Sequence, residues 1–353
     1  MPGTVKCVIW DLDQTLWRGV LLEDAEVTVP DAVRVTIAEL DARGILQSVA
    51  SRNDHDHAWR RLEELGLAEY FVVPRIGWGR KSDAVREIAD TLSFAPSAVA
   101  FIDDQPTERA EVAYHLPAVR CYPAEQAPAL LALPEFSPVV TVDARRRREM
   151  YQAGFRREAE RTAFAGPDED FLRSLELSME IRRAGEEDLV RVEELTLRTS
   201  QMNATGVHYP ADTLRSLLAD PTHEVLVTTL TDRFGPHGAV GILLVARHDT
   251  VWHLKLLATS CRVVSFGAGA VILRWLTDQA AAAGVHLVAD LRRTDRNRMM
   301  EVAYRFAGFD DERCTCGLAL GPDPALQRLH LVPAPQPAPD TMRVLAPSLA
   351  VAR

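Results

Sequence analysis

Two aspartates at the end of an apolar strand are the residues of this chain best suited to chemistry. Residues 5–10 read VKCVIW and lead into Asp11 and Asp13, with Thr15 following. Where a strand ends and loops over, both carboxylates can turn towards one point at the carboxyl edge of a sheet. Close carboxylates repel each other unless a cation lies between them, and hard oxygen ligands suit Mg²⁺. Asp11 would then attack phosphorus and Asp13 would protonate the leaving oxygen. A polar strand end that caps the next segment is the alternative interpretation.

Three further segments place a hydroxyl, an ammonium or a carboxylate at the boundary of a predicted element. An ammonium at a helix start is electrostatically unfavourable unless an anion lies nearby, so Lys81 indicates an anion site. One at a time, these residues are better explained as strand-end or solvated side chains, and it is their order that favours function. They are Ser51, Arg52 and Asn53 after an apolar strand over 44–51, Lys81 before a helix over 81–92, and Asp103 with Asp104 after an apolar run over 98–102.

The order DxDxT, Ser, Lys and DD resembles the haloacid dehalogenase (HAD) superfamily of phosphohydrolases. The resemblance implies that Asp11 becomes an aspartyl-phosphate, and that Asp13 is the general acid and base, with a main-chain carbonyl facing the metal. The segment between Thr15 and the second strand has room for a hairpin and one helix but not for a large cap domain. The implied sites are a Mg²⁺ site at Asp11, Asp13, Asp103 and Asp104, and a phosphate site at Ser51, Arg52, Asn53 and Lys81.

Length and composition predict two soluble domains. A chain of 353 residues exceeds one ordinary domain, and 47% hydrophobic with 25% charged residues is typical of a globular protein. No apolar run approaches the roughly 20 residues that span a bilayer, and MPGTVK lacks a signal-peptide core, so we expect a cytoplasmic protein. A net charge of −10 disfavours nonspecific nucleic-acid binding. The five scattered cysteines predict reduced thiols.

The second half of the chain mixes strands and helices around a glycine-bearing loop, RVVSFGAG. This order resembles the GNAT acyltransferase fold, in which N–H groups at a helix start bind the pyrophosphate of coenzyme A. The loop departs from the usual Arg/Gln-x-x-Gly-x-Gly pattern at Val264 or Ser265, depending on the register. The predicted fold class is therefore α/β, with a HAD-type doubly wound parallel sheet lacking a large cap, plus a C-terminal α+β GNAT-like domain. The predicted boundaries are 1–125 for the phosphatase domain, 126–170 for a linker and connecting helix, 171–330 for the acyltransferase domain, and 331–353 for a flexible or loosely docked Pro/Ala-rich tail.

Cys261 stands where a strand gives way to the glycine-bearing loop. The adjacent Arg262 and the following helix N-terminus favour a nucleophilic thiolate, whereas a buried, inert cysteine is the alternative. The polar stretch RTSQMNAT follows a helix and is suited to grip hydroxyls and phosphate, or to form a hydrogen-bonded loop. His253 is either a base or a packed strand histidine. The candidate substrate-binding residues are Arg198, Gln201, Asn203, Thr205, His253 and Arg262.

The segments DLDQTLWRG, SRND and IDDQP together with RTSQMNAT and TSCRV resemble the FkbH-like proteins of polyketide pathways, over residues 1–312. The resemblance implies loading of a glyceryl unit from 1,3-bisphosphoglycerate, through a thioester on Cys261, onto the phosphopantetheine thiol of an acyl carrier protein, with removal of phosphate. Gln14, Gln105 and the Ser265–Phe266 loop depart from that family. The alternatives are a HAD phosphatase with a non-catalytic partner-binding domain, and a GNAT-type acyl-CoA N-acyltransferase on a degenerate HAD scaffold.

Overall fold

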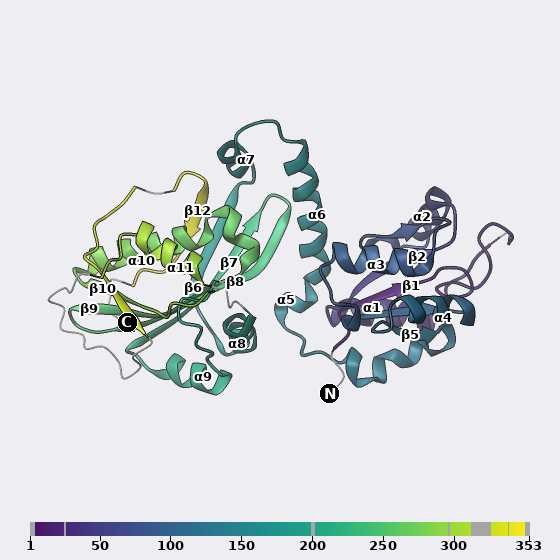
Figure 1. The fold of residues 1–353 in the computed structure, drawn as a ribbon, viewed down its shortest axis with the longest axis horizontal. Helices are drawn as coiled ribbons and strands as arrows, with labels where there is room; N and C mark the ends of the chain where they lie inside the picture. Colours follow the sequence, from purple (N-terminus) through teal and green to yellow (C-terminus); the bar gives the residue numbers. More distant parts are fainter. Residues whose placement is uncertain are drawn as a thin grey trace. The chain divides into compact units, whose positions relative to one another are not determined.

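The chain folds as two compact units, Met1–Phe155 and Arg156–Arg353, and each builds its own sheet (Figure 1). Among the residues that the structure describes, none of the helices combines the length and apolarity needed to cross a bilayer. The computed structural model describes residues 4–24, 26–198, 202–295, 297–311, 326–337 and 339–349.

The first unit is built on a five-stranded parallel sheet in the order β3-β2-β1-β4-β5. The chain adds strands on one side of β1 and then crosses to add β4 and β5 on the other side. The strand order therefore reverses between β1 and β4, and ligands of open α/β sheets bind at the carboxyl ends of strands at such a point. The strands are β1 Cys7–Trp10, β2 Leu46–Ser51, β3 Arg75–Ile76, β4 Val99–Asp103 and β5 Arg120–Pro123.

Helices cover both faces of this sheet, which explains why its central strands are apolar throughout. On β1, Val8 and Trp10 face a core formed with α1 and α2, whereas Cys7 and Ile9 face a core formed with α3 and α4. Asp54 caps α2 by accepting a hydrogen bond from the His57 N–H. The helices are α1 Asp31–Ala42, α2 His55–Glu64, α3 Lys81–Thr91 and α4 Pro106–His115.

The first unit extends beyond the predicted boundary at residue 125, because α5 (Val142–Arg145) and the start of α6 (Arg147–Ala163) pack against the end of α1. Gly44 has a φ of 72°, and a Cβ there would lie 2.3 Å from the Ala144 carbonyl oxygen. Arg148 Nε donates to Asp41 at 2.9 Å. Arg148 therefore anchors α6 to the end of α1.

The second unit contains a mixed seven-stranded sheet in the order β11-β10-β9-β8-β7-β6-β12. Strands β6 to β9 are antiparallel neighbours, whereas β9 and β10 are parallel. The expectation of a loosely docked tail over 331–353 is wrong for residues 342–345, which form β12 in parallel pairing with β6. The strands are β6 Leu177–Arg183, β7 His223–Asp232, β8 Gly235–Arg247, β9 Val251–Thr259, β10 His286–Leu291, β11 Gln327–Leu331 and β12 Met342–Leu345.

Helices also cover both faces of the second sheet (Figure 1). Apolar residues of α10 and α11 pack on one face, and those of α8 and α9 pack on the other. The predicted fold class, a doubly wound parallel sheet without a large cap followed by an α+β unit, is confirmed. The helices are α7 Asp168–Ser174, α8 Leu189–Arg198, α9 Ala211–Ala219, α10 Ala268–Ala283 and α11 Arg298–Phe306.

Candidate active site

Three carboxylates meet at the carboxyl ends of β1 and β4. Asp11 follows β1, Asp103 ends β4 and Asp104 follows it, and one oxygen from each lies within 4.8 Å of the others. The parallel register brings them together, because Trp10 is paired with Ile102 and the Asp11 N–H donates to the Ile102 carbonyl at 2.9 Å. Hard carboxylate oxygens at this spacing fit a magnesium ion.

Lys81 supplies a buried cation to the same cluster. Its ammonium donates to Asp11 Oδ1, to Asp103 Oδ2 at 3.2 Å and to the Ala50 carbonyl at 2.8 Å. The side chain begins α3 and is almost fully buried. Protein carboxylates thus lie beside the ammonium at this helix start, and the role of Lys81 in phosphate binding stays a prediction.

Burial destabilises the ionised forms of Asp103 and Asp104. Desolvation raises the pKa of Asp103 to about 6, with Lys81 opposing the rise and the neighbouring Asp11 adding to it. Burial also raises the pKa of Asp104, again with a contribution from Asp11. A divalent cation held by Asp11, Asp103 and Asp104 would stabilise all three carboxylates, so the residues present fit the predicted Mg²⁺.

Asp13 is oriented by three hydrogen-bond donors. Its Oδ1 accepts from Trp17 Nε1 at 2.8 Å and from the Leu21 N–H at 3.0 Å, and its Oδ2 accepts from Asn53 Nδ2 at 3.0 Å. Asp13 is not among the three clustered carboxylates, so any metal contact would use its main-chain carbonyl, as the HAD resemblance implies. The Asn53 amide, predicted to bind phosphate, is engaged with Asp13 in this conformation.

Trp17 is a site residue that was not predicted from the sequence. A loop returns its indole to a carboxylate only four positions earlier, and Gln14 within that loop has a left-handed φ of 55°. A tryptophan so close to the DxD pattern was the available signal. Sequence alone could not show the direction of its ring.

Most of the predicted phosphatase residues surround one small cavity of about 100 Å³. Ser51 lies at its wall and is buried. Arg52 Nη1 lies 2.8 Å from Glu108 Oε1, and Glu108 is a second lining residue that was not predicted from the sequence. The lining comprises Asp11, Asp13, Ser51, Arg52, Lys81, Gln105 and Glu108.

The loop after β4 is held by its neighbours. Arg109 Nη1 donates to the Asp103 carbonyl at 2.6 Å and to the Asp104 carbonyl at 2.8 Å. Thr15 Oγ1 accepts from the Asp104 N–H at 2.9 Å, which connects the loop after β1 to the loop after β4. These bonds fix the carboxylates before any ligand binds.

In the second unit, Cys261 is exposed at the first position of a 3₁₀ helix, Cys261–Phe266. The Ser260 hydroxyl accepts from the Arg262 N–H at 3.4 Å and from Arg262 Nε at 3.3 Å, so the Arg262 side chain folds back onto the residue that precedes the cysteine. Cys261 is therefore not a buried cysteine, and its role as a nucleophile stays a prediction.

The segment 202–205 fills the space where β9 and β10 diverge. The two strands pair only as far as Leu254 and Ala289. Beyond that point the Ala204 N–H donates to Leu257 at 3.1 Å, and the Arg292 N–H donates to Ala204 at 2.9 Å. The segment therefore continues the hydrogen bonding of both strand ends.

The polar side chains of that segment hold its own loop together. Asn203 is buried, and its Oδ1 accepts from the N–H groups of Thr205 at 3.0 Å and Gly206 at 2.9 Å. Asn203 and Thr205 thus act in this conformation as loop-forming residues. The Arg198 side chain and the whole of Gln201 lie outside the described residues.

His253 belongs to a polar cluster on β9, β10 and β11. Its Nε2 lies 2.9 Å from Asp290 Oδ2, and Arg328 Nε donates to Asp290 Oδ1 at 3.0 Å. Burial lowers the pKa of His253, and the Asp290 carboxylate opposes this effect. Its environment is that of a packed strand histidine.

No protein-family profile and no curated protein sequence matches this chain. Several solved structures resemble parts of it. One is the N-terminal part of a Bacteroides fragilis protein, which contains a phosphatase domain and was solved in complex with Mg. The match covers 38% of this chain and 40% of that chain, with 29% sequence identity and a TM-score of 0.35. This chain thus spans less than half of that protein.

Acetyltransferase structures are also similar to part of the chain. An aminoglycoside acetyltransferase in complex with coenzyme A is 16% identical over 43% of this chain and 94% of that one, with a TM-score of 0.33. A spermidine N-acetyltransferase from Vibrio cholerae was solved in complex with CoA and spermine. It is 12% identical over 43% of this chain and 94% of that one, with a TM-score of 0.32. All three TM-scores are below 0.5, so we base the function on the geometry of the sites.

Proposed function

We propose that the first unit is a Mg²⁺-dependent phosphatase acting on phosphate monoesters. The observation that carries this proposal is the convergence of Asp11, Asp103 and Asp104 with the Lys81 ammonium at the carboxyl ends of neighbouring parallel strands. The cavity beside them also contains Asp13, a second carboxylate available for proton transfer.

The chemistry follows from these positions. An Asp11 oxygen attacks phosphorus, the ester P–O bond breaks, and Asp13 gives its proton to the leaving alkoxide. Asp13 then takes a proton from water, which attacks the aspartyl-phosphate and releases inorganic phosphate and free Asp11. Lys81 and Ser51 hold the phosphoryl oxygens. Bound Mg²⁺ would supply positive charge that offsets the repulsion between phosphate and carboxylates.

We further propose that the second unit transfers a glyceryl unit from 1,3-bisphosphoglycerate to an acyl carrier protein. The Cys261 thiolate attacks the acyl phosphate carbonyl, a C–S bond forms, and the C–O bond to phosphate breaks with release of inorganic phosphate. The phosphopantetheine thiol then attacks this thioester and regenerates the thiolate. The exposure of Cys261 beside Arg262 supports this step, and the activated substrate removes any need for ATP.

Intact-mass spectrometry tests both halves. Purified protein is mixed with Mg²⁺ and 1,3-bisphosphoglycerate, with and without a carrier protein. We expect a glyceryl adduct on the chain that is absent in Cys261→Ala and retained in the matched control Cys121→Ala. In Asp11→Asn the adduct should keep its phosphate. An adduct that persists in Cys261→Ala, or an adduct in Asp11→Asn that has lost its phosphate ester, would contradict the proposal.

A second candidate is a phosphatase whose second unit only binds a partner. The internal hydrogen bonding of Asn203 and the filled space between β9 and β10 favour it. In that case Cys261→Ala leaves carrier loading unchanged. The remaining alternative, an acyl-CoA N-acyltransferase on a degenerate HAD scaffold, requires coenzyme A binding and no Mg²⁺ dependence.

A further inference from the structure

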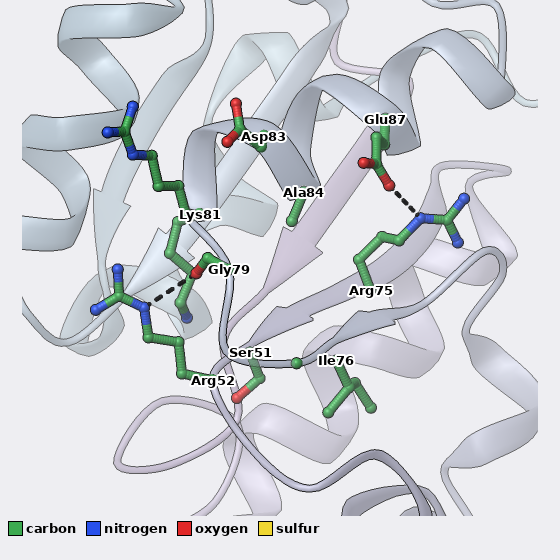
Figure 2. Close-up of a pocket in the computed structure, with 11 residues that line it drawn as sticks. Ser51, Arg52, Arg75, Ile76, Gly79, Lys81, Asp83, Ala84 and Glu87 are labelled. Atoms are coloured by element: carbon green, nitrogen blue, oxygen red, sulfur yellow. Dashed lines mark hydrogen bonds and ion pairs between the residues drawn. The ribbon is translucent and has the colours of Figure 1, made fainter.

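A second and larger cavity, of about 330 Å³, adjoins the cavity that contains Asp11. Ser51, Arg52 and Lys81 line both cavities, so the two share a wall at the predicted phosphate site. Figure 2 shows Arg52 and Lys81 on one side of this second cavity and Arg75 on the other. A substrate whose phosphoryl group reacts at Asp11 therefore has space to extend past these shared residues.

The acidic groups around the second cavity are already neutralised. Glu87 accepts from Arg75 Nε at 2.9 Å, and this pair is drawn in Figure 2. Asp83 is paired with Arg86 at 3.0 Å on the same helix. Neither acid is therefore left to repel an anion that enters the cavity.

Arg80 supplies a positive charge that is not neutralised. Its side chain lines the cavity, is exposed, and makes no hydrogen bond or ion pair with any residue that the structure describes. It immediately precedes α3 and makes no capping hydrogen bond, so its charge adds to the positive end of that helix. The net charge of the whole chain is −10, so the positive charge at this cavity is opposite in sign to that of the chain.

The loop between β3 and α3 leaves room for a ligand. Gly77 and Gly79 line the cavity, and a Cβ at either position would meet no other atom within 4 Å. The open loop, the cationic side chains and the shared wall thus occur at one place.

We infer that this cavity binds a second anionic group, carboxylate or phosphate, of the same molecule whose phosphate ester is cleaved at Asp11. The inference rests on the phosphatase half of the proposed function and narrows its substrate class. The preferred substrates are phosphate esters that carry another negative charge, and esters of neutral alcohols are poorer. Arg80 contributes to this selectivity by binding the second anion.

A matched pair of substrates tests this inference. Glycerol 3-phosphate carries a neutral hydroxymethyl group at the position where 3-phosphoglycerate carries a carboxylate, and the two are otherwise the same. We expect wild-type full-length protein with Mg²⁺ to have a higher kcat/KM for 3-phosphoglycerate. Arg80→Gln should reduce that preference about tenfold, the usual effect of losing one charge-assisted hydrogen bond. Arg60→Gln makes the same charge change at an exposed position of α2 and should preserve the preference for 3-phosphoglycerate.

A second substrate pair, propane-1,3-diol bisphosphate against its monophosphate, separates phosphate from carboxylate as the second group. The inference would be overturned if wild type showed no higher kcat/KM for the doubly anionic member of either pair. It would also be overturned if Arg80→Gln left that preference unchanged. Failure of the proposed phosphatase is a distinct result, since no ester would then release phosphate with Mg²⁺. In that event, calorimetric binding of the same ligands to wild type and Arg80→Gln still decides whether the cavity selects a second anion.

Discussion

The Lys81 ammonium lies 3.2 Å from the Asp103 carboxylate, and both side chains are almost completely buried. Lys81 also contacts Asp11, so one cation balances two carboxylates that face each other in a region of low dielectric. Removal of one partner from a buried ion pair leaves an uncompensated charge, which costs more than the pair itself contributes. Lys81 therefore has a structural role as well as its proposed role in phosphate binding.

Lys81→Met should lower the free energy of unfolding by roughly 3–5 kcal/mol in the absence of divalent ions. Mg²⁺ should restore part of this loss, because it also balances the carboxylates. Urea unfolding with and without Mg²⁺ measures both effects. Lys6→Met, at a partly exposed lysine, is the control, and its free energy of unfolding should fall by less than that of Lys81→Met. Equal stability of Lys81→Met and wild type without Mg²⁺ would show that the cluster does not need its cation.

A pH effect is expected in the second unit at Asp232. Burial alone would raise the pKa of Asp232, but hydrogen bonds from His237 and Arg157 outweigh it and hold the pKa at about 2. This folded-state pKa is below the ordinary value of 3.8, so the unfolded chain takes up the proton first as the pH falls. The stabilisation is thus complete above about pH 4 and is lost as the pH falls through about 2.

Asp232→Asn should remove this pH dependence. The free energy of unfolding of the wild type should exceed that of the variant by about 2 kcal/mol near neutral pH, and this excess should shrink towards pH 2. Hydrogen exchange of β7 and β8 at several pH values measures it locally. A difference that stays constant from pH 5 to pH 2 would disprove the assignment.

Thiol reactivity should separate Cys261 from the other described cysteines. Burial raises the pKa of Cys121 to about 11 and also raises the pKa of Cys7, whereas Cys261 is exposed. We expect iodoacetamide to alkylate Cys261 at least about tenfold faster than Cys121 in the native protein. Peptide mass spectrometry over time measures each rate, and similar native rates for Cys261 and Cys7 would be inconsistent with the structure.

Gly44→Ala should destabilise the first unit by roughly 2–4 kcal/mol, because a left-handed backbone and a close backbone carbonyl act together. Gly66→Ala is the matched control. Gly66 has a similar φ of 68°, but a Cβ there would meet no atom within 4 Å, so only the conformational cost of about 1 kcal/mol is expected. Denaturant midpoints compare the two. Equal losses would mean that the contact with Ala144 is relieved without cost.

The parts of the first unit that sequence could predict are those that depend on local pattern. Strands β1, β2 and β4 are short apolar runs that end in polar residues, and parallel pairing brings those ends together. The orientation of Asp13 depends on Asn53, forty positions away, and on the path of the loop that carries Trp17. No periodicity encodes such contacts.

In the second unit, the sequence predicted a mixture of strands and helices around the glycine-bearing loop but not the edges of the sheet. Strand β6 alternates buried and exposed positions, which is a weak signal in a charged segment. Strand β12 lies among prolines and is a strand only because β6 offers it an unpaired edge. The segment 202–205 likewise derives its structure from the strand ends on either side.

The pairing of β6 with β12 has a consequence for synthesis. All five strands of the first sheet have left the ribosome once residue 123 has emerged, so that unit can fold while translation continues. The outer edge of β6 must instead wait for residues 342–345, made more than 150 positions later. During that interval the nascent second sheet presents a bare strand, which a chaperone would need to shield from neighbouring polypeptides.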